Sequence, residues 1–373
     1  MEAIISEDQI IRESVLKEIN TQIDLVKELV EQQLNSDTEG NNITLDKPHN
    51  RIVFGAPGTG KSFRLKEDIK QNKLEGVCER ITLHPNYTYT QFVGTYKPIS
   101  KIVKEGEQEK NIVAYEFVPG PFLRVLIDAL RDEDKNIPHV LVIEEINRAN
   151  PAGVFGDVFQ LLDRDSTGKS TYTINISEEM KKYISEKLNR PINELYIPSN
   201  MYIWATMNSA DQGVYPMDSA FKRRWAFEYI GVNENEHQLH GKPFEFIYLK
   251  NEQGGYTKYK WNTVRKAINA QLKSYVNEDK LLGPFFLSET ELQQDNKMFD
   301  ETFKSKVLMY LFEDILKHKK VDFFVSDVML LSDVMDAYDK GCIFNFEIQS
   351  EEIDYSSETS QIQQYSGVAE EQN

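Results

Sequence analysis

Residues 55–62 are the part of the chain best suited to chemistry on a phosphate group. In order they are Gly55, Ala56, Pro57, Gly58, Thr59, Gly60, Lys61 and Ser62. They match the phosphate-binding pattern G-x-x-x-x-G-K-[ST] at every fixed position. Glycine lets the backbone turn tightly and aim successive N–H groups at an anion. We therefore expect Lys61 to reach the β- and γ-phosphates of a nucleotide and the Ser62 hydroxyl to bind Mg²⁺.

Two adjacent carboxylates, Glu144 and Glu145, follow the apolar run 139–143. A short continuous apolar run is typical of a central parallel strand buried on both faces, and open α/β sheets bind ligands at the carboxyl ends of such strands. We expect Glu144 to hold Mg²⁺ through water and Glu145 to orient or activate the attacking water. The alternative is a solvated strand end with no ligand.

Three further polar residues are candidates for the same reaction. Asn208 follows the apolar run 201–206, where its amide could meet the γ-phosphate or the attacking water. Arg223 and Arg224 end a short basic stretch, which could be a solvated face. Either arginine could instead stabilise charge on the phosphates of a neighbouring subunit.

Strand and helix patterns alternate along the first two thirds of the chain, which predicts an α/β fold with a parallel sheet. Apolar runs predict strands at 51–54, 80–83, 112–118, 139–143 and 201–206. Apolar residues at helical spacing predict helices at 62–71, 122–131, 151–164 and 178–188. Lys97, Lys101, Lys104 and Lys110 lie in a stretch that we expect to be a solvated loop. Beyond residue 241, expected helices at 261–275, 289–292 and 303–317 predict a small helical lid.

The expected organisation is an N-terminal helical extension (1–48), a nucleotide-binding core (49–240), the helical lid (241–348) and a disordered acidic tail (349–373). The chain has 373 residues and a net charge of -17, so its surface repels DNA, and DNA contact should be local or made by a partner. Two cysteines without metal-ligand spacing suit a reducing compartment. With no secretory signal or membrane span apparent, we expect a cytoplasmic protein.

Four segments together resemble the AAA+ subunit of McrB-type restriction systems. They are residues 55–62, 142–150, 205–212 and 218–225. The turn 282–286 and the segment 306–312 also look like the lid of such proteins. The phosphate loop alone is generic, whereas the runs Glu145 to Asn150 and Met207 to Asp211 are far more specific.

The resemblance implies an AAA+ three-layer αβα core with a small helical lid, and subunits assembled as a hexameric ring. It implies ATP or GTP as substrate, Mg²⁺ as cofactor and a separate nuclease subunit, with DNA reached through that partner or the ring pore. Carried across, Lys61 and Ser62 bind phosphate and Mg²⁺, and Glu144 takes the metal-side acidic position. Glu145 would be the catalytic acid/base, Asn208 the γ-phosphate sensor, and Arg223 or Arg224 the trans-acting arginine.

One departure and two alternatives remain. The family usually has Asp where Glu144 stands, and the extra methylene of glutamate moves the carboxylate. The chain could instead be a MoxR-like or dynein-related ATPase that remodels a protein, or a switch or scaffold that hydrolyses too slowly to matter. No P-D…(D/E)-x-K nuclease pattern stands out in a suitable strand, so we expect no nuclease site in this chain, and the sequence leaves ATP against GTP open.

Overall fold

A computed structural model of the chain describes residues 45–105, 108–209, 213–317, 322–325 and 328–350. The expected N-terminal helix and acidic tail lie outside these residues, apart from 45–48 and 349–350.

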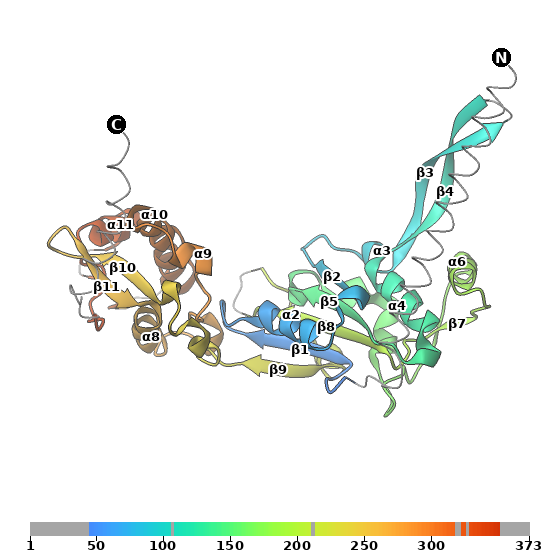
Figure 1. Cartoon of the computed structure of the whole chain (residues 1–373), viewed down its shortest axis with the longest axis horizontal. Helices are drawn as coiled ribbons and strands as arrows, with labels where there is room; N and C mark the ends of the chain where they lie inside the picture. Colours follow the sequence, from blue (N-terminus) through green and yellow to red (C-terminus); the bar gives the residue numbers. More distant parts are fainter. Residues whose placement is uncertain (1–44, 106–107, 210–212, 318–321, 326–327, 351–373) are drawn as a thin grey trace, which may run out of the picture. The chain divides into compact units, whose positions relative to one another are not determined.

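A five-stranded parallel sheet forms the centre of the nucleotide-binding part (Figure 1). In spatial order its strands are β2 (Cys78–Thr82), β5 (His139–Glu144), β8 (Met201–Met207), β1 (Asn50–Gly55) and β9 (Ala226–Ile230). Every neighbouring pair is parallel. The carboxyl ends of β1, β8 and β5 therefore meet at one edge of the sheet, where ligands of open α/β sheets bind.

Helices cover both faces of this sheet. On β5, Val142 packs in the hydrophobic cluster that includes side chains of α2 (Lys61–Gln71). The next residue, Ile143, packs in the cluster that includes side chains of α4 (Pro121–Arg131). Because successive side chains of a strand point to opposite faces, the two clusters lie on the two sides of the sheet. The three-layer α/β fold expected from the sequence is thus confirmed.

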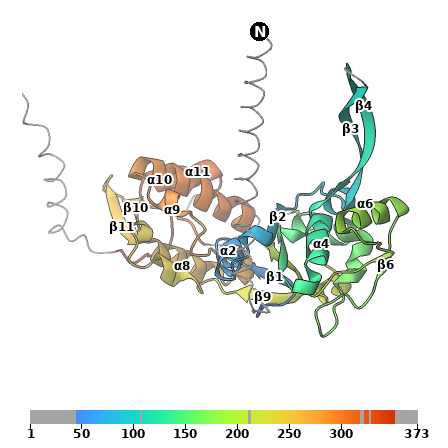
Figure 2. The same cartoon turned by 45° about the vertical axis from the view of Figure 1, so that its right-hand side comes forward.

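An antiparallel hairpin replaces the expected solvated loop around the four lysines. It pairs β3 (Gly94–Glu105) with β4 (Gln108–Pro119), and Figures 1 and 2 show it extending away from the sheet. The prediction of a loop was wrong because the lysines obscured the alternation of side chains that is typical of a strand. Ile102, Val113 and Tyr115 share one face of the hairpin and are 68%, 68% and 72% exposed.

The expected helix at 151–164 is interrupted. Its first part is α5 (Pro151–Phe155), and residues Gly156–Leu162 continue as a 3-10 helix. Gly156 has a φ of 51°, and a Cβ there would lie 2.7 Å from the Tyr89 ring. The close approach of Tyr89 requires glycine at this position, and its positive φ ends the α-helix.

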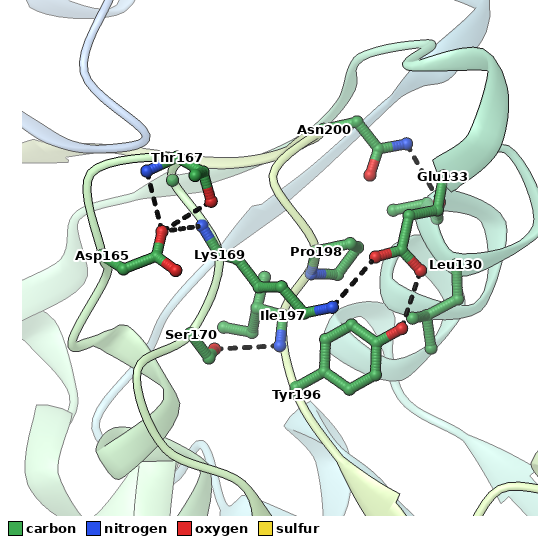
Figure 3. A network of polar contacts seen from close by, with 12 residues as sticks. Leu130, Glu133, Asp165, Thr167, Lys169, Ser170, Tyr196, Ile197, Pro198 and Asn200 are labelled. Atoms are coloured by element: carbon green, nitrogen blue, oxygen red, sulfur yellow. Dashed lines mark hydrogen bonds and ion pairs between the residues drawn. The ribbon is translucent and has the colours of Figure 1, made fainter.

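Three short elements precede β8. They are β6 (Ile174–Asn175), α6 (Glu178–Leu188) and β7 (Glu194–Leu195). A polar network holds this segment in place (Figure 3). The Tyr196 hydroxyl donates to Glu133 Oε2 at 2.7 Å, and Lys169 Nζ lies 3.4 Å from Glu133 Oε1 and 4.0 Å from the centre of the Tyr196 ring. The residues just before β6 and just after β7 are therefore tied to the residues that follow α4.

Residues beyond 231 build a second hydrophobic cluster. Their main elements are β10 (Phe246–Lys250), β11 (Tyr256–Lys260), α8 (Trp261–Leu272), α9 (Glu289–Leu292), α10 (Asn296–Thr302) and α11 (Leu331–Asp339). The β10–β11 hairpin was not expected, and the helix expected at 303–317 is π-helical over Phe303–Leu308 and Tyr310–Leu316. Within the described part of the chain, no helix is both long and apolar enough to cross a membrane.

Candidate nucleotide-binding site

The phosphate loop joins the carboxyl end of β1 to the first residue of α2. Gly58 and Gly60 have φ values of 72° and 93°, which only glycine adopts readily. The loop thus delivers the amino end of α2, with its unpaired N–H groups and partial positive charge, to an anion. The Lys61 ammonium donates to the carbonyl oxygens of Gly55 and Ala56, both at 3.0 Å.

The acidic end of β5 lies against the start of α2. Ser62 Oγ donates to Glu144 Oε2 at 2.8 Å, and Thr206 Oγ1 donates to the same oxygen at 2.5 Å. Thr206 is on β8, the strand between β1 and β5. The structure therefore brings together the phosphate loop and the carboxylate that the sequence placed in one site.

Glu145 has a backbone conformation that is uncommon for glutamate. Its φ and ψ are 55° and 51°, in the left-handed region. Its N–H donates to Thr206 Oγ1 at 3.1 Å, and its Oε2 lies 3.6 Å from Arg148 Nε. Strained backbone of this kind is concentrated at functional sites. This conformation turns the chain immediately after the strand.

Asn208, the expected γ-phosphate sensor, follows the carboxyl end of β8. It is 9% exposed. Its carbonyl oxygen accepts from Asn147 Nδ2 at 2.8 Å, and the carbonyl of Asn147 accepts from the Tyr215 N–H at 2.8 Å. Asn147 thus fixes the backbone at Asn208 relative to the segment that follows Glu145.

The two candidate arginines have different surroundings. Arg224 donates to Asp163 Oδ2 at 2.6 Å and to the carbonyl of Ala220 at 2.7 Å, and its side chain is 8% exposed. Its guanidinium also lies 4.0 Å from the centre of the Phe159 ring. Arg223, by contrast, is exposed. Arg224 is therefore held by contacts within the chain, whereas Arg223 faces solvent.

The turn at 282–286 contacts the phosphate loop directly. The N–H groups of Gly283 and Phe285 donate to the carbonyls of Pro57 and Gly58, both at 2.8 Å. Asn235 Nδ2 donates to the next carbonyl, that of Thr59, at 2.8 Å. Because phosphate binding uses the N–H groups of such a loop, these contacts hold the loop without taking the donors that a phosphate needs.

Side chains of helix α8 bind the backbone of this turn. The side-chain amide of Asn269 both donates to and accepts from the backbone of Leu282, each at 2.8 Å. Trp261 Nε1 donates to the carbonyl of Pro284 at 2.8 Å. Arg265 is completely buried, and burial lowers its pKa to about 10. Its guanidinium lies 2.9 Å from Glu236 Oε2, so the buried cation has a carboxylate partner.

A cavity of about 530 Å³ opens beside the phosphate loop. Its lining combines three aromatic side chains with three polar or charged ones, and it consists of Gly60, Phe63, Gln238, Lys242, Phe244, Phe285 and Glu289. Cavities of this size and chemistry commonly hold small organic ligands.

Sequence reasoning missed several residues that shape this site. Thr206 binds both consecutive acidic residues, and the signal for it was a hydroxyl at the end of an otherwise apolar run. Asn147 lies in a recognised segment, but nothing in the sequence says that it binds the backbone of Asn208. Asn235 carried no signal, since its contact with Thr59 depends on how distant parts of the chain pack.

The donor atoms at this edge suit a magnesium nucleotide. Ser62 Oγ and Glu144 Oε2 are adjacent oxygen atoms, the ligand type that Mg²⁺ prefers. When bound, the ion would neutralise charge on the β- and γ-phosphates. Lys61 and the amino end of α2 add positive charge at the same place. Glu145 and Asn208, which the sequence assigned to the same site, directly follow the carboxyl ends of the neighbouring strands β5 and β8.

Comparison with known proteins agrees with this geometry. Residues 50–225 match the family described as AAA domain (dynein-related subfamily). The YdiS component of the type II restriction enzyme BsuMI, from Bacillus subtilis (strain 168), is 44% identical over 323 residues, which cover 81% of this chain and 89% of that protein.

A second relative is the EcoKMcrB subunit of a type IV methyl-directed restriction enzyme from Escherichia coli (strain K12). It is 30% identical over 186 residues, which are 48% of this chain and 34% of that protein, so this chain matches about a third of its length. A crystal structure of a Cytophaga hutchinsonii protein aligns over 90% of this chain and 88% of its own, but its 12% identity and TM-score of 0.29 support no argument. With the phosphate loop, the parallel sheet and these relatives together, the chain belongs to the McrB-like AAA+ P-loop NTPases.

Proposed function

We propose that this chain is the nucleotide-hydrolysing subunit of a restriction system and works with a separate nuclease subunit on DNA. The observation that carries the proposal is the contact of Ser62 with Glu144, which joins the phosphate loop to the acidic strand end. Two relatives named as restriction components supply the biological setting. We assign residues 49–240 to the nucleotide-binding core and residues 241–348 to the lid.

Within one site, we assign each side chain a separate task. Lys61 and the loop N–H groups bind the triphosphate, while Ser62 and Glu144 hold Mg²⁺ directly or through water. Glu145 orients or deprotonates the attacking water, and Asn208 contacts the γ-phosphate or that water.

The site needs an arginine from a second copy of the chain. Strands β1 and β9 are parallel, with Arg51 opposite Ala226 and Gly55 opposite Ile230. Arg223 precedes β9, whereas the phosphate loop follows β1, so the length of a strand separates them. Five residues of strand span roughly 16 Å. Arg223 is therefore too far from its own triphosphate, and we propose that it serves a neighbour in a ring, expected to be hexameric.

We further propose that the nucleoside occupies the cavity beside Gly60. A base could stack on Phe63 or Phe285, and Gln238 and Glu289 offer polar groups to its edge. These groups suit either purine, so hydrolysis should be measured with ATP and with GTP.

Lys61→Ala tests the assignment of the site. We expect this variant to lose nucleotide binding, because the ammonium that meets the phosphates is removed. Binding of fluorescent ATP and GTP analogues measures the loss, and Lys182→Ala on the distant helix α6 is the matched control. Unchanged affinity in Lys61→Ala would contradict the assignment.

Affinity capture from the native host, with DNA and a slowly hydrolysed nucleotide present, tests the restriction setting. Recovery of a nuclease subunit with the wild-type chain, and its loss with Lys61→Ala, is the expected result. Recovery of a folded protein client without a nuclease would favour the remodelling alternative, for which the match to the dynein-related subfamily is the supporting observation.

A further inference from the structure

Arg80, a residue of the edge strand β2, reaches into the proposed magnesium site. Its guanidinium forms an ion pair with Glu144 Oε1. In the sheet Arg80 lies opposite Val142, and Thr82 lies opposite Glu144. Because residues two apart on a strand point to the same side, Arg80 and Glu144 are diagonal neighbours on one face. No role was expected for Arg80 from the sequence.

This ion pair completes the set of contacts around Glu144. One carboxylate oxygen, Oε2, accepts from Ser62 and Thr206, and the other, Oε1, faces Arg80. The Glu144 side chain is 13% exposed, so water replaces few of these contacts. The guanidinium thus balances a poorly hydrated negative charge beside the phosphate loop.

The length of the glutamate side chain fits this arrangement. In this structure the Glu144 side chain spans from Ser62 on α2 to Arg80 on β2. Glu144 therefore joins the helix that follows the phosphate loop to the edge strand of the sheet.

We propose that Arg80 is a positioning residue that holds the Glu144 carboxylate toward Ser62 when no metal is bound and that competes with Mg²⁺ for it. The inference rests on the proposed function, since it concerns the metal-side acid of that site. Two cations at one carboxylate repel each other. Over about 5 Å the repulsion between a dication and a guanidinium corresponds to about a tenfold weaker association even at the dielectric constant of bulk water, so the effect at this largely buried carboxylate should be at least that large. Arg80 also favours a metal-free triphosphate, because its positive charge remains near the phosphates.

The test measures nucleotide affinity with and without metal. Binding of a fluorescent ATP or GTP analogue is followed in EDTA and across a Mg²⁺ titration for wild type, Arg80→Gln and Arg80→Lys. We expect Arg80→Gln to lower the midpoint of the Mg²⁺ titration about tenfold and to weaken binding in EDTA. Arg80→Lys keeps the positive charge but loses the planar guanidinium group, so its midpoint should fall between those of wild type and Arg80→Gln.

Arg124→Gln is the matched control. Arg124 pairs with Glu79, the neighbour of Arg80 on β2, and its side chain is 47% exposed. Its loss should leave both affinities unchanged. If Arg80→Gln weakened nucleotide binding equally with and without Mg²⁺, Arg80 would be a direct phosphate ligand and the proposal would be overturned. An unchanged midpoint of the Mg²⁺ titration would also overturn it. A wild-type chain that binds no nucleotide would instead refute the proposed function itself.

Discussion

At the scale of single residues, Glu145 combines a strained backbone with the position expected of the catalytic carboxylate. A left-handed conformation costs a residue such as glutamate roughly 1–3 kcal/mol. The hydrogen bond from its N–H to Thr206, a residue that also binds Glu144, helps to hold the turn. The strained residue thus lies where the consecutive carboxylates of Glu144 and Glu145 point to different partners.

Glu145→Gln should separate binding from turnover. The amide keeps the size of the side chain but cannot take a proton, so we expect hydrolysis to slow by at least about 100-fold. Nucleotide affinity should stay close to that of wild type. Phosphate release and analogue binding measure the two effects, with Glu178→Gln, an exposed residue of α6, as control. Full hydrolysis in Glu145→Gln would move the catalytic role elsewhere.

His49 should make the fold less stable in acid. Burial lowers its pKa below the usual 6.5, and its Nε2 lies 2.7 Å from the carbonyl of Ser199. The unfolded chain therefore takes up a proton near pH 6.5 that the folded chain binds only at lower pH. The free energy of unfolding should fall as the pH drops below that value. Urea unfolding at pH 7.5 and 5.5 should show a smaller fall in His49→Gln than in wild type or in His240→Gln, an exposed control.

At the scale of elements, the sequence predicted the central strands well. The runs at 51–54, 139–143 and 201–206 all lie inside β1, β5 and β8. Strands buried on both faces are continuously apolar, so their signal is local and strong. The phosphate loop and the two glutamates were found for the same reason, since each is a short contiguous pattern.

Elements and contacts with weaker local signals were missed. The strand expected at 112–118 lies inside β4, but its partner β3 was expected to be a loop because lysines interrupt its apolar residues. The binding of Thr206 to Glu144, and of Gly283 to Pro57, joins residues far apart in the chain. No local pattern in the sequence specifies which distant residues form these hydrogen bonds, because the contacts arise only when the strands and the turn at 282–286 pack together.

Gly283→Ala should disturb the contact between the turn at 282–286 and the phosphate loop. A Cβ at Gly283 would lie 2.3 Å from the carbonyl carbon of Gly58, so the two backbones must move apart. We expect nucleotide affinity to fall, with a loss of stability of about 1–3 kcal/mol. Gly76→Ala is the control, since a Cβ there meets nothing within 4 Å. Wild-type affinity in Gly283→Ala would show that the turn does not set the shape of the loop.

At the scale of the whole molecule, the two arginines before β9 should behave differently when replaced singly. Arg223→Ala should keep nucleotide binding and thermal stability but stop hydrolysis, because only the neighbour's site loses a charge. Arg224→Ala should lower the free energy of unfolding by about 2 kcal/mol, because Asp163 loses its partner. Thermal unfolding and phosphate release measure both variants. Loss of hydrolysis in Arg224→Ala without loss of stability would reverse the assignment.

If Arg223 serves a neighbour as proposed, its separation from the phosphate loop by the length of a strand would give each copy two different contact faces, one that provides Arg223 and one that provides the phosphate loop. In a ring built from such faces, the arginine face of each copy meets the loop face of the next. A substitution on one face of a copy therefore affects a different interface from a substitution on its other face. Chains carrying Lys61→Ala and chains carrying Arg223→Ala are each expected to be inactive alone. When the two variants are mixed in equal amounts, about a quarter of the interfaces should be intact. In these interfaces one chain supplies an intact phosphate loop and its neighbour supplies an intact Arg223.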